Sequence, residues 1–452
     1  MRYSNSFFQY VAVCFALIAG SPAILMPSFA AAEVVNALPK DTLRGYMQLS
    51  LKDNTKLLAP ARAAFEKGDI DECRRLLERA AAESGIMPHP EVQLATWFLS
   101  AGKTGAAQQI LEKVSLDEPN RPDLRWLYCQ VALSQGRLFD AWTHVLLAER
   151  TPTPSRWTKE YADHMKGLIA KSKAAIADQR GDWAVSEKLH KELLVMGVRT
   201  ATVDRALGRA AFFQDRPDEA YKYFVRASQS NELDALPQLL MAAMYEQKGN
   251  AEKTEEWFKK GDAAGNQDAE RIRLEYIRWL IRQNRSADAR RVATKFRPSD
   301  ENRRDFEYAI ALCGRMDGDF AVAEKILSRL NLASPKSFAI SNQLALVLVE
   351  SGDQGKLGRA MQLAQTNARN FPNSSDAITT YGWVQQRLGD SVGANQTFGV
   401  LLRSKQASRD AAYYIAQVNY SLGQKEAGDA FIQAAKNSEG EFFNAFRVDE
   451  KL

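Results

Sequence analysis

Small residues recur along this chain at fixed distances from a repeated glycine, asparagine or aspartate. Eleven such marker residues align, and seven of the ten intervals between them are 34 residues, the others being 45, 35 and 37. The markers are Gly68, Gly102, Gly136, Gly181, Asp215, Gly249, Asn284, Gly318, Gly352, Gly389 and Gly423. Seven residues before them stand Ala61, Ala95, Cys129, Ala174, Gly208, Ala242, Ile277, Ala311, Ala345, Gly382 and Ala416. Five residues after them stand Cys73, Ala107, Ala141, Ser186, Ala220, Thr254, Ala289, Ala323, Ala394 and Gly428, with Ala360 in the ninth unit after three extra residues.

These two columns are small far more often than chance allows. Only Ile277 among their members is large, whereas average usage predicts on the order of a third small residues. Larger apolar residues follow the second column by four positions, on the same helix face. They are Leu77, Leu111, Val145, Phe224, Phe258, Leu327, Phe398 and Ile432, with His190 and Ala293 as weak members.

This pattern predicts pairs of short antiparallel helices. Gly, Asn and Asp tolerate the positive φ that ends a helix in a tight turn. Small side chains let two helix axes approach closely, and the larger residues fill the space one turn further on. We therefore expect an all-α chain in which each unit is one helix, a turn and a second helix.

The period and the columns together resemble the tetratricopeptide repeat, a 34-residue helix–turn–helix. Leu207-Gly208 followed by Ala220 and Phe224 matches that family best, and Tyr245 matches its late tyrosine. Three prolines fall where the family's closing proline belongs: Pro119, Pro335 and Pro372. The resemblance covers roughly residues 54–440, although the family's leading tryptophan is largely missing. It implies a right-handed α-solenoid of about eleven repeats.

The regions outside the repeats carry separate predictions. Arg2, an apolar run over residues 7–18 and small residues before Ala32 predict a signal peptide over 1–32, cleaved after Ala30 or Ala32. The alternative is an uncleaved membrane anchor, but the run is shorter than the ~20 residues that span a bilayer. The predicted location is therefore periplasmic or secreted, without an integral membrane segment after cleavage. Residues 33–53 are predicted to be a lead-in that covers the first repeat.

The repeats are predicted to fall into two groups. Repeats 1–3 occupy 54–150 and repeats 4–11 occupy 168–440, with a proline-containing insertion at 151–167 between them. Two X-Pro steps in that insertion disfavour helix, so we expect a kink or a long loop there. The tail at 441–452 carries Phe442, Phe443 and Phe446 on one helical face. We expect them to cap the last repeat, the alternative being a docking peptide.

Composition excludes several classes of function. The net charge is +5, and Lys and Arg are dispersed without a basic block, so a nucleic-acid partner is not expected. No HExxH or CxxC spacing occurs, and we predict no metal, cofactor or catalytic residue. Cleavage would leave Cys73, Cys129 and Cys313, which we interpret as three buried thiols acting as compact apolar fillers.

Two groups of residues are candidates for binding a partner, because their offsets from the markers place them on the concave side of the first helices. The basic group is Arg205, Arg209, Arg271, Arg278, Arg282 and Arg315. Arginine suits carboxylate or phosphate groups, while the alternative is a solvated face neutralised by nearby acids. The aromatic group is Tyr308, Trp383, Tyr413 and Tyr420, with Trp126, Phe212 and Phe213 in earlier repeats. Exposed aromatics hold extended peptides, while the alternative is that they pack against neighbouring helices.

Three functions are compatible with these features to different degrees. The first is a non-catalytic scaffold of the bacterial cell envelope that binds a protein or peptide partner in the concave groove. The second is an accessory scaffold of an envelope complex for exopolysaccharide assembly or export, which rests on analogy with the repeat family. The third is an enzyme with Glu275 and Asp305 as an acid/base pair. It is disfavoured because nothing in the sequence fixes their geometry.

Overall fold

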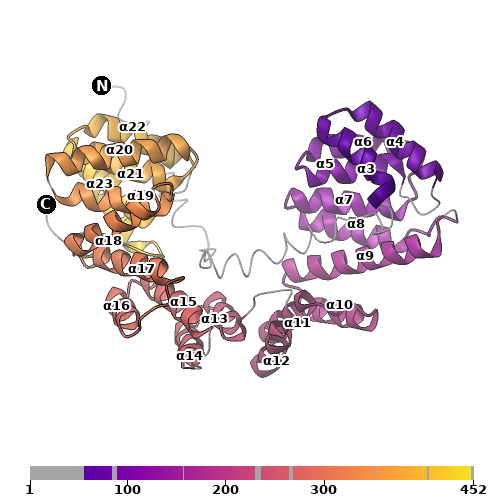
Figure 1. Cartoon of the computed structure of the whole chain (residues 1–452), viewed down its shortest axis with the longest axis horizontal. Helices are drawn as coiled ribbons and strands as arrows, with labels where there is room; N and C mark the ends of the chain where they lie inside the picture. The colour runs from indigo at the N-terminus through magenta and orange to yellow at the C-terminus, as the bar shows by residue number, and fades with distance from the viewer. Residues whose placement is uncertain are drawn as a thin grey trace. The chain divides into compact units, whose positions relative to one another are not determined.

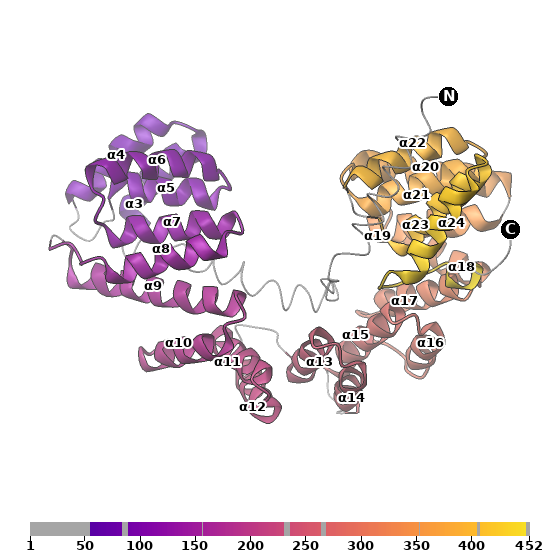
Figure 2. The ribbon, with the colours of Figure 1, turned by 180° about the vertical axis from the view of Figure 1, so that it is seen from behind.

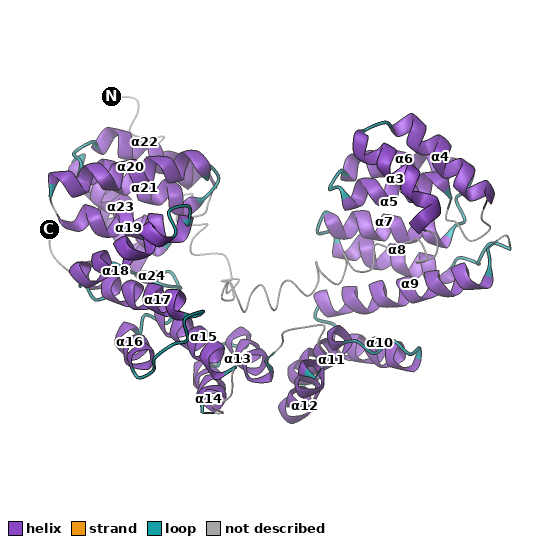
Figure 3. Ribbon diagram, viewed as in Figure 1, coloured by secondary structure: helices purple, strands orange, loops and turns teal. Residues whose placement is uncertain are grey.

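The computed structural model describes residues 55–83, 89–155, 157–229, 236–263, 268–351, 353–404 and 407–448. Within these ranges the chain is helical and contains no strand (Figure 3). It divides into two compact units at Asn250 and Ala251. We describe the N-terminal unit (described residues of 55–250) and the C-terminal unit (described residues of 251–448) separately (Figure 1). The predicted signal peptide and lead-in lie outside the described residues, as does the marker Gly352.

The helices follow the predicted units in order. The N-terminal unit contains α3 (Thr55–Lys67), α4 (Ile70–Glu83), α5 (Pro90–Ser100), α6 (Thr104–Asp117), α7 (Pro122–Ser134), α8 (Leu138–Arg150), α9 (Lys159–Gln179), α10 (Trp183–Val195), α11 (Ala201–Phe213), α12 (Pro217–Ser228) and α13 (Pro237–Gln247). The C-terminal unit contains α14 (Ala251–Asp262), α15 (Ala269–Arg282), α16 (Ser286–Thr294), α17 (Arg303–Met316), α18 (Phe320–Ala333), α19 (Phe338–Leu348), η2 (Val349–Ser351), α20 (Gln354–Asn370), α21 (Ser375–Arg387), α22 (Ser391–Ser404), α23 (Arg409–Ser421), α24 (Lys425–Asn437) and η3 (Ala445–Arg447). The prediction of an all-α solenoid of helix pairs is confirmed.

The turn inside each repeat forms for the predicted reason. Every marker in the described residues has a positive φ, from +58° at Asn284 to +88° at Gly389. Asp215 and Asn284 are the two non-glycine residues with positive φ in this part of the chain. A side chain at such a φ is tolerated mainly for Asn and Asp, which explains why only these types replace glycine at the markers.

Packing inside the repeats follows the small columns. Gly208 lies so close to Phe224 that a Cβ atom would stand 2.4 Å from the ring, and Gly382 stands in the same relation to Phe398 at 2.9 Å. Both phenylalanines are fully buried. Two of the exceptions to the columns fall in one repeat, where a large Ile277 occurs with a small Ala293, and both are buried. Bulk is therefore exchanged between the two positions of a pair, which keeps the filled volume similar.

The proline-containing insertion differs from the prediction. The described residues 151–155 and 157–158 are non-helical, and α9 already begins at Lys159. The insertion therefore lengthens the first helix of the fourth repeat. Tyr161 and Met165 belong to the same buried core as Leu124 and Val145, so the solenoid does not divide at this point. The division lies instead within the sixth repeat, between α13 and α14.

Candidate functional site

The first helices of successive repeats line one face of the C-terminal unit. α15 contacts α17, α17 contacts α19, α19 contacts α21, and α21 contacts α23. Arg315 on α17 also reaches Tyr414 on α23, with Nη2 donating to the phenol oxygen at 3.1 Å. Residues three repeats apart can meet in this way only on the concave side of a curved stack. We call this surface the inner face and define it by Arg315, Glu350, Trp383, Asp410 and Tyr414.

Local signals position the helices that carry the inner face. The side chain of Ser374 accepts a hydrogen bond from the backbone of Ala377 and starts α21. The side chain of Ser408 accepts one from Ala411 and starts α23. Such N-caps satisfy backbone donors that a helix leaves open. They fix the first turn of α23, where Asp410 enters the inner face.

Arg315 is an organising residue of this face. It is 5% exposed, and Nη1 donates to Gln343 at 2.6 Å while Nη2 donates to Tyr414. Burial raises the pKa of Asp410, and the charge of Arg315 opposes that rise. The guanidinium therefore balances a buried acid and does not lie on the solvated face that the alternative interpretation of the basic group expected.

The predicted aromatic residues are mostly packed between helices. Trp383 is 4% exposed, stacks on Tyr414 with ring centroids 4.3 Å apart, and donates from Nε1 to Glu350 at 3.0 Å. Tyr413 is also buried. Tyr420 lies against Gly428, and its hydroxyl donates to Asp429 at 2.8 Å. These residues occupy the positions that the alternative interpretation gave them.

The remaining aromatic candidates are placed similarly. Tyr308 is half-buried, and its hydroxyl donates to the Ala339 carbonyl at 3.4 Å. In the N-terminal unit, Trp126 is fully buried and donates to Ser172 at 2.9 Å. Phe212 is buried as well, while Phe213 is half-buried and stacks on Trp183 at 4.5 Å. A concave-face register therefore does not by itself make a side chain accessible.

The basic candidates separate into buried and accessible members. Arg209 is buried and pairs with Asp178 at 3.1 Å. Arg205 is also buried, and desolvation lowers the pKa of its guanidinium to about 10. Arg271, Arg278 and Arg282 on α15 are half-buried. These three arginines of α15 therefore keep part of their surface accessible to a partner.

Arg278 is an accessible charge held in a defined position. Its guanidinium pairs with Glu275 at 2.6 Å on the same helix and with Asp305 on α17 at 3.2 Å. Its side chain remains 40% exposed. The two carboxylates considered as an acid/base pair are thus partners of one arginine. This geometry is that of an ion-pair bridge between neighbouring first helices.

The segment after α24 lies on the inner face, which sequence reasoning missed. Its backbone is held by Asn284, whose Nδ2 donates to the Gly440 carbonyl at 3.1 Å and whose Oδ1 accepts from Phe442 N–H at 2.7 Å. Phe446 packs against Gly318, at the marker turn of the eighth repeat. Figure 2 shows this end of the chain beside α17 and α18.

The expectation that the tail caps the last repeat is therefore too narrow, because its contacts reach back to the seventh repeat. The three phenylalanines of the tail indicated in the sequence that it packs against the repeats. Which repeats they contact depends on the curvature of the stack, which the sequence columns do not specify.

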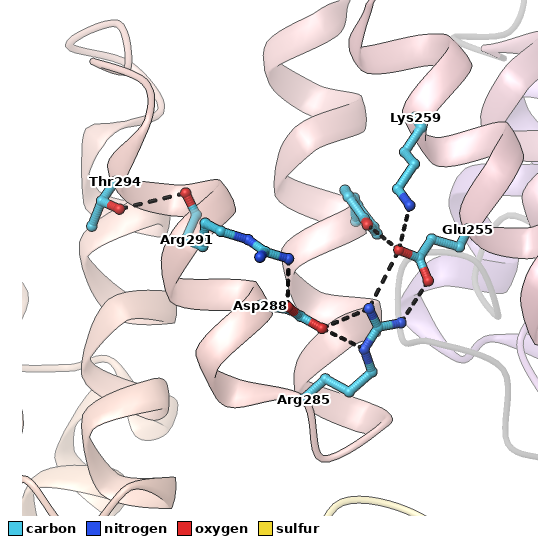
Figure 4. Close-up of polar contacts among 7 residues, drawn as sticks. Glu255, Lys259, Arg285, Asp288, Arg291 and Thr294 are labelled. Carbon is cyan, nitrogen blue, oxygen red and sulfur yellow. Dashed lines mark hydrogen bonds and ion pairs between the residues drawn. The ribbon is translucent and has the colours of Figure 1, made fainter.

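A second polar network joins the repeats at the start of the C-terminal unit (Figure 4). Glu255 on α14 accepts from Arg285 at 2.5 Å, from Lys259 at 2.8 Å and from the Tyr276 hydroxyl at 2.7 Å. Arg285 also pairs with Asp288 at 2.6 Å. The hydrogen bond from Arg285 is the largest cause that lowers the pKa of Glu255 to about 2. This carboxylate is therefore ionised at neutral pH and links two repeats.

The three cysteines in the described residues are buried and unpaired with one another. Desolvation raises the pKa of Cys73 to about 11 and those of Cys129 and Cys313 to about 12. The thiolate is the nucleophilic form, so these groups are unsuited to nucleophilic chemistry at neutral pH. The interpretation of the cysteines as apolar fillers is confirmed.

Comparison with known proteins gives likenesses to helical repeat structures. The sequence matches no family model and no curated protein. Among solved structures, PilW, a type IV pilus biogenesis factor, is 20% identical, with a TM-score of 0.35 over 47% of this chain and 96% of that chain. The P58(IPK) TPR domain is 17% identical, with a TM-score of 0.25 over 75% of this chain and 99% of that chain. A tetratricopeptide repeat protein from Parabacteroides merdae is 11% identical, with a TM-score of 0.32 over 63% of this chain and 96% of that chain.

At such identities and TM-scores these structures indicate nothing about a partner or a location. The repeat architecture is instead established by the described residues, through the 34-residue period, the positive-φ turns and the buried small columns. Among the described helices, none combines the length and the apolar character that a membrane crossing requires.

Proposed function

We propose that this chain is a non-catalytic interaction scaffold of the bacterial cell envelope, which holds a protein or peptide partner on the concave side of its first helices. The observation that carries the proposal is the inner face of the C-terminal unit. There, α15 to α23 form one continuous surface, and Arg278 supplies an exposed charge on it. Solenoids of this kind use such concave surfaces for binding.

The accessible arginines of α15 favour an acidic or carboxylate-bearing partner at this end of the face. Arg278 already bridges Glu275 and Asp305, so a partner carboxylate would exchange one ion pair for another. Exposed pairs of this kind contribute little to stability. The exchange therefore has a small penalty, and the partner would gain a charge-assisted hydrogen bond.

The test is recovery of a partner from envelope extract with the tagged full chain and with Arg278→Glu. We expect the substitution to deplete the recovered partner. Arg291→Glu is the matched control, because Arg291 lies on the second helix α16, is 64% exposed and also pairs with an acid, Asp288. Equal recovery with both variants would show that the partner does not use the inner face.

The envelope location is a separate part of the proposal and is tested independently. It is supported by the charge and apolar pattern of residues 1–32. We expect a reporter fused after Ala32 to be exported and processed, and an Arg2-to-acidic change combined with polar residues in 7–18 to retain it. Retention of the unmodified fusion in the cytoplasm would remove this part of the proposal and leave the scaffold intact.

A further inference from the structure

We propose that the inner face of repeats seven to eleven is a peptide-binding site that the chain's own segment Ser438–Val448 occupies in cis. The partner ligand would be a protein segment of the same chemistry: two adjacent aromatic residues, an amide side chain and a basic residue three positions later. This deepens the proposed function, since it takes the inner face as the partner surface. We call Ser438–Val448 the cis segment.

Side chains of other repeats hold the cis segment by its backbone. It is not helical between α24 and η3, and its backbone bonds to side chains of other repeats. The Asn284 side chain donates one hydrogen bond to the backbone of the segment and accepts another from it. Asp410 accepts from the backbone N–H groups of Phe443 at 3.2 Å and Asn444 at 3.1 Å. Side chains that satisfy the backbone of one non-helical segment can also bind the backbone of another, since the backbone is common to all sequences.

The adjacent aromatic residues anchor the cis segment. Phe442 and Phe443 are 2% and 5% exposed. The guanidinium of Arg315 lies over Phe443 at 4.3 Å from the ring centroid, and that of Arg409 lies over Phe442 at 4.7 Å. A cation over a desolvated ring is a favourable contact. The site therefore selects two consecutive aromatic rings, each under its own arginine.

Polar side chains supply the rest of the specificity. The Asn444 amide donates to Asp410 and, at 3.1 Å, to the Tyr414 hydroxyl. Arg447 pairs with Glu350 at 2.6 Å, and that carboxylate also accepts from Trp383. Glu350 is 4% exposed, and a buried carboxylate requires a partner. Asp410 therefore recognises the amide side chain, and Glu350 recognises the basic residue.

The contacts extend well beyond what a cap on the last repeat requires. A cap needs only α23 and α24, whereas the cis segment also contacts Asn284, Gly318 and Glu350 of the seventh, eighth and ninth repeats. It thus runs across the surface on which Arg315 and Trp383 lie. These are positions that the sequence predicted to face a ligand, and the ligand in this structure is the chain itself.

Several features make the cis segment suited to displacement. Phe446 remains 39% exposed, and Ala445 is exposed as well, so the end of the segment is open to solvent. A segment linked in cis competes at an effective concentration in the mM range for short linkers. Only a partner that binds much more tightly, or that is itself held nearby, would replace it. The cis segment therefore sets a threshold for partner binding.

The test measures binding of a labelled peptide that carries the sequence of 438–448 by fluorescence anisotropy. The receptor is the full chain with Phe443→Ala, Asn444→Ala and Arg447→Glu, which loosen the cis segment in place. We expect saturable binding to this loosened chain and at least about tenfold weaker binding to the unmodified chain. Glu439→Lys, at an exposed position of the same segment, is the matched control and should behave as the unmodified chain does.

A second receptor keeps the test decisive if the first receptor does not fold. The chain without residues 438–452 should bind the same peptide, and retained helicity by circular dichroism shows that it is folded. A peptide with Asn444→Ala and Arg447→Glu should bind at least about tenfold more weakly, because Asp410 and Glu350 lose their partners. Absence of binding to both folded receptors, or equal binding to loosened and unmodified chains, would overturn the proposal.

Two further outcomes are informative. A dimer of the unmodified chain that disappears when residues 438–452 are removed would identify a second copy as the occupant and overturn the choice of a partner protein. The peptide measurement requires no envelope extract. Peptide binding without partner recovery would therefore count against the proposed function alone, and partner recovery without peptide binding would count against this inference alone.

Discussion

Gly208→Ala tests the packing between paired helices, because the gain in helix propensity and the cost of a steric clash oppose each other and can be separated. Gly208 lies inside α11, and an added Cβ would stand 2.4 Å from Phe224 Cε1 and 2.7 Å from Cδ1. Carbon atoms pack comfortably at about 3.5–4.0 Å, so the ring would have to move by about 1 Å. Phe224 is fully buried and has no solvent to move into.

The expected change in the free energy of unfolding is the difference between the gain in helix propensity and the cost of overpacking. Replacing glycine by alanine inside a helix stabilises by about 1 kcal/mol. Overpacking a filled core costs about 1–3 kcal/mol, and a 2.4 Å contact with a fully buried ring argues for the upper end. We expect a net loss of about 2 kcal/mol, which corresponds to roughly 5 °C in the thermal midpoint for a unit of this size.

Gly167→Ala provides the control. Gly167 lies within α9 of the same unit, and an added Cβ would meet no atom within 4 Å. Its helix propensity gain of about 1 kcal/mol is therefore unopposed. The two alanine variants should shift the thermal midpoint in opposite directions, as followed by the helical band in circular dichroism.

A rescue variant tests whether the clash itself is the cause. Gly208→Ala combined with Phe224→Leu places at these two positions the residues that the first repeat has at the equivalent ones, Ala61 and Leu77, which are both buried. We expect the double variant to be about 1–2 kcal/mol more stable than the sum of the single changes, since neighbours in contact couple by that order. Additive effects, or a stabilised Gly208→Ala chain, would refute the assigned register.

Three further predictions concern the turn, the inter-repeat network and pH. Gly102→Ala should destabilise by about 1 kcal/mol, because the φ of +72° is strained for alanine although no atom lies within 4 Å; an unchanged urea midpoint would contradict it. Glu255→Gln should cost about 3 kcal/mol at pH 7, the equivalent of lowering the carboxyl pKa from 4.5 to about 2. That stability is present above pH 4.5 and is lost as the pH falls toward 2, so urea titrations of the variant should lack this pH dependence. Burial lowers the pKa of His190 below its usual 6.5, so the unfolded chain takes up a proton that the folded chain refuses and stability falls as the pH drops below 6.5. His190→Leu should remove this loss, and an equal slope of the thermal midpoint between about pH 7 and pH 5 in both chains would exclude the histidine as its source.

Local signals explain how much of the fold was predictable. Marker turns, small columns and apolar fillers each depend on residues within one repeat, and the same requirements recur eleven times. Because the same pattern recurs in every repeat, one atypical copy does not change the alignment. Ile277 and Ala293 could therefore be assigned to their columns from the sequence, although each has an unusual size for its column. The insertion was misjudged because Pro152 and Pro154 disfavour helix only for the residues next to them. The helix resumed at Lys159, within the segment assigned to the insertion.

The candidate site was harder to predict, because accessibility depends on distant repeats. The sequence placed Arg315 and Trp383 on the concave side, and the structure shows them buried there. Offsets from a marker give a direction around one helix but give no information on what lies opposite. Arg278 pairs with acids of its own helix and of the next first helix, and 40% of its side chain stays exposed.

The sequence by itself determined the helix pairs, their turns and the face that each first helix presents, because these follow from backbone preference and from contacts within a repeat. Tertiary structure alone decided that Arg315 meets Tyr414, 99 residues later, and that Phe442 meets Asn284, 158 residues earlier. Small rotations between successive repeats add up along the stack, and no single column records them. Their sum brings the cis segment onto the inner face.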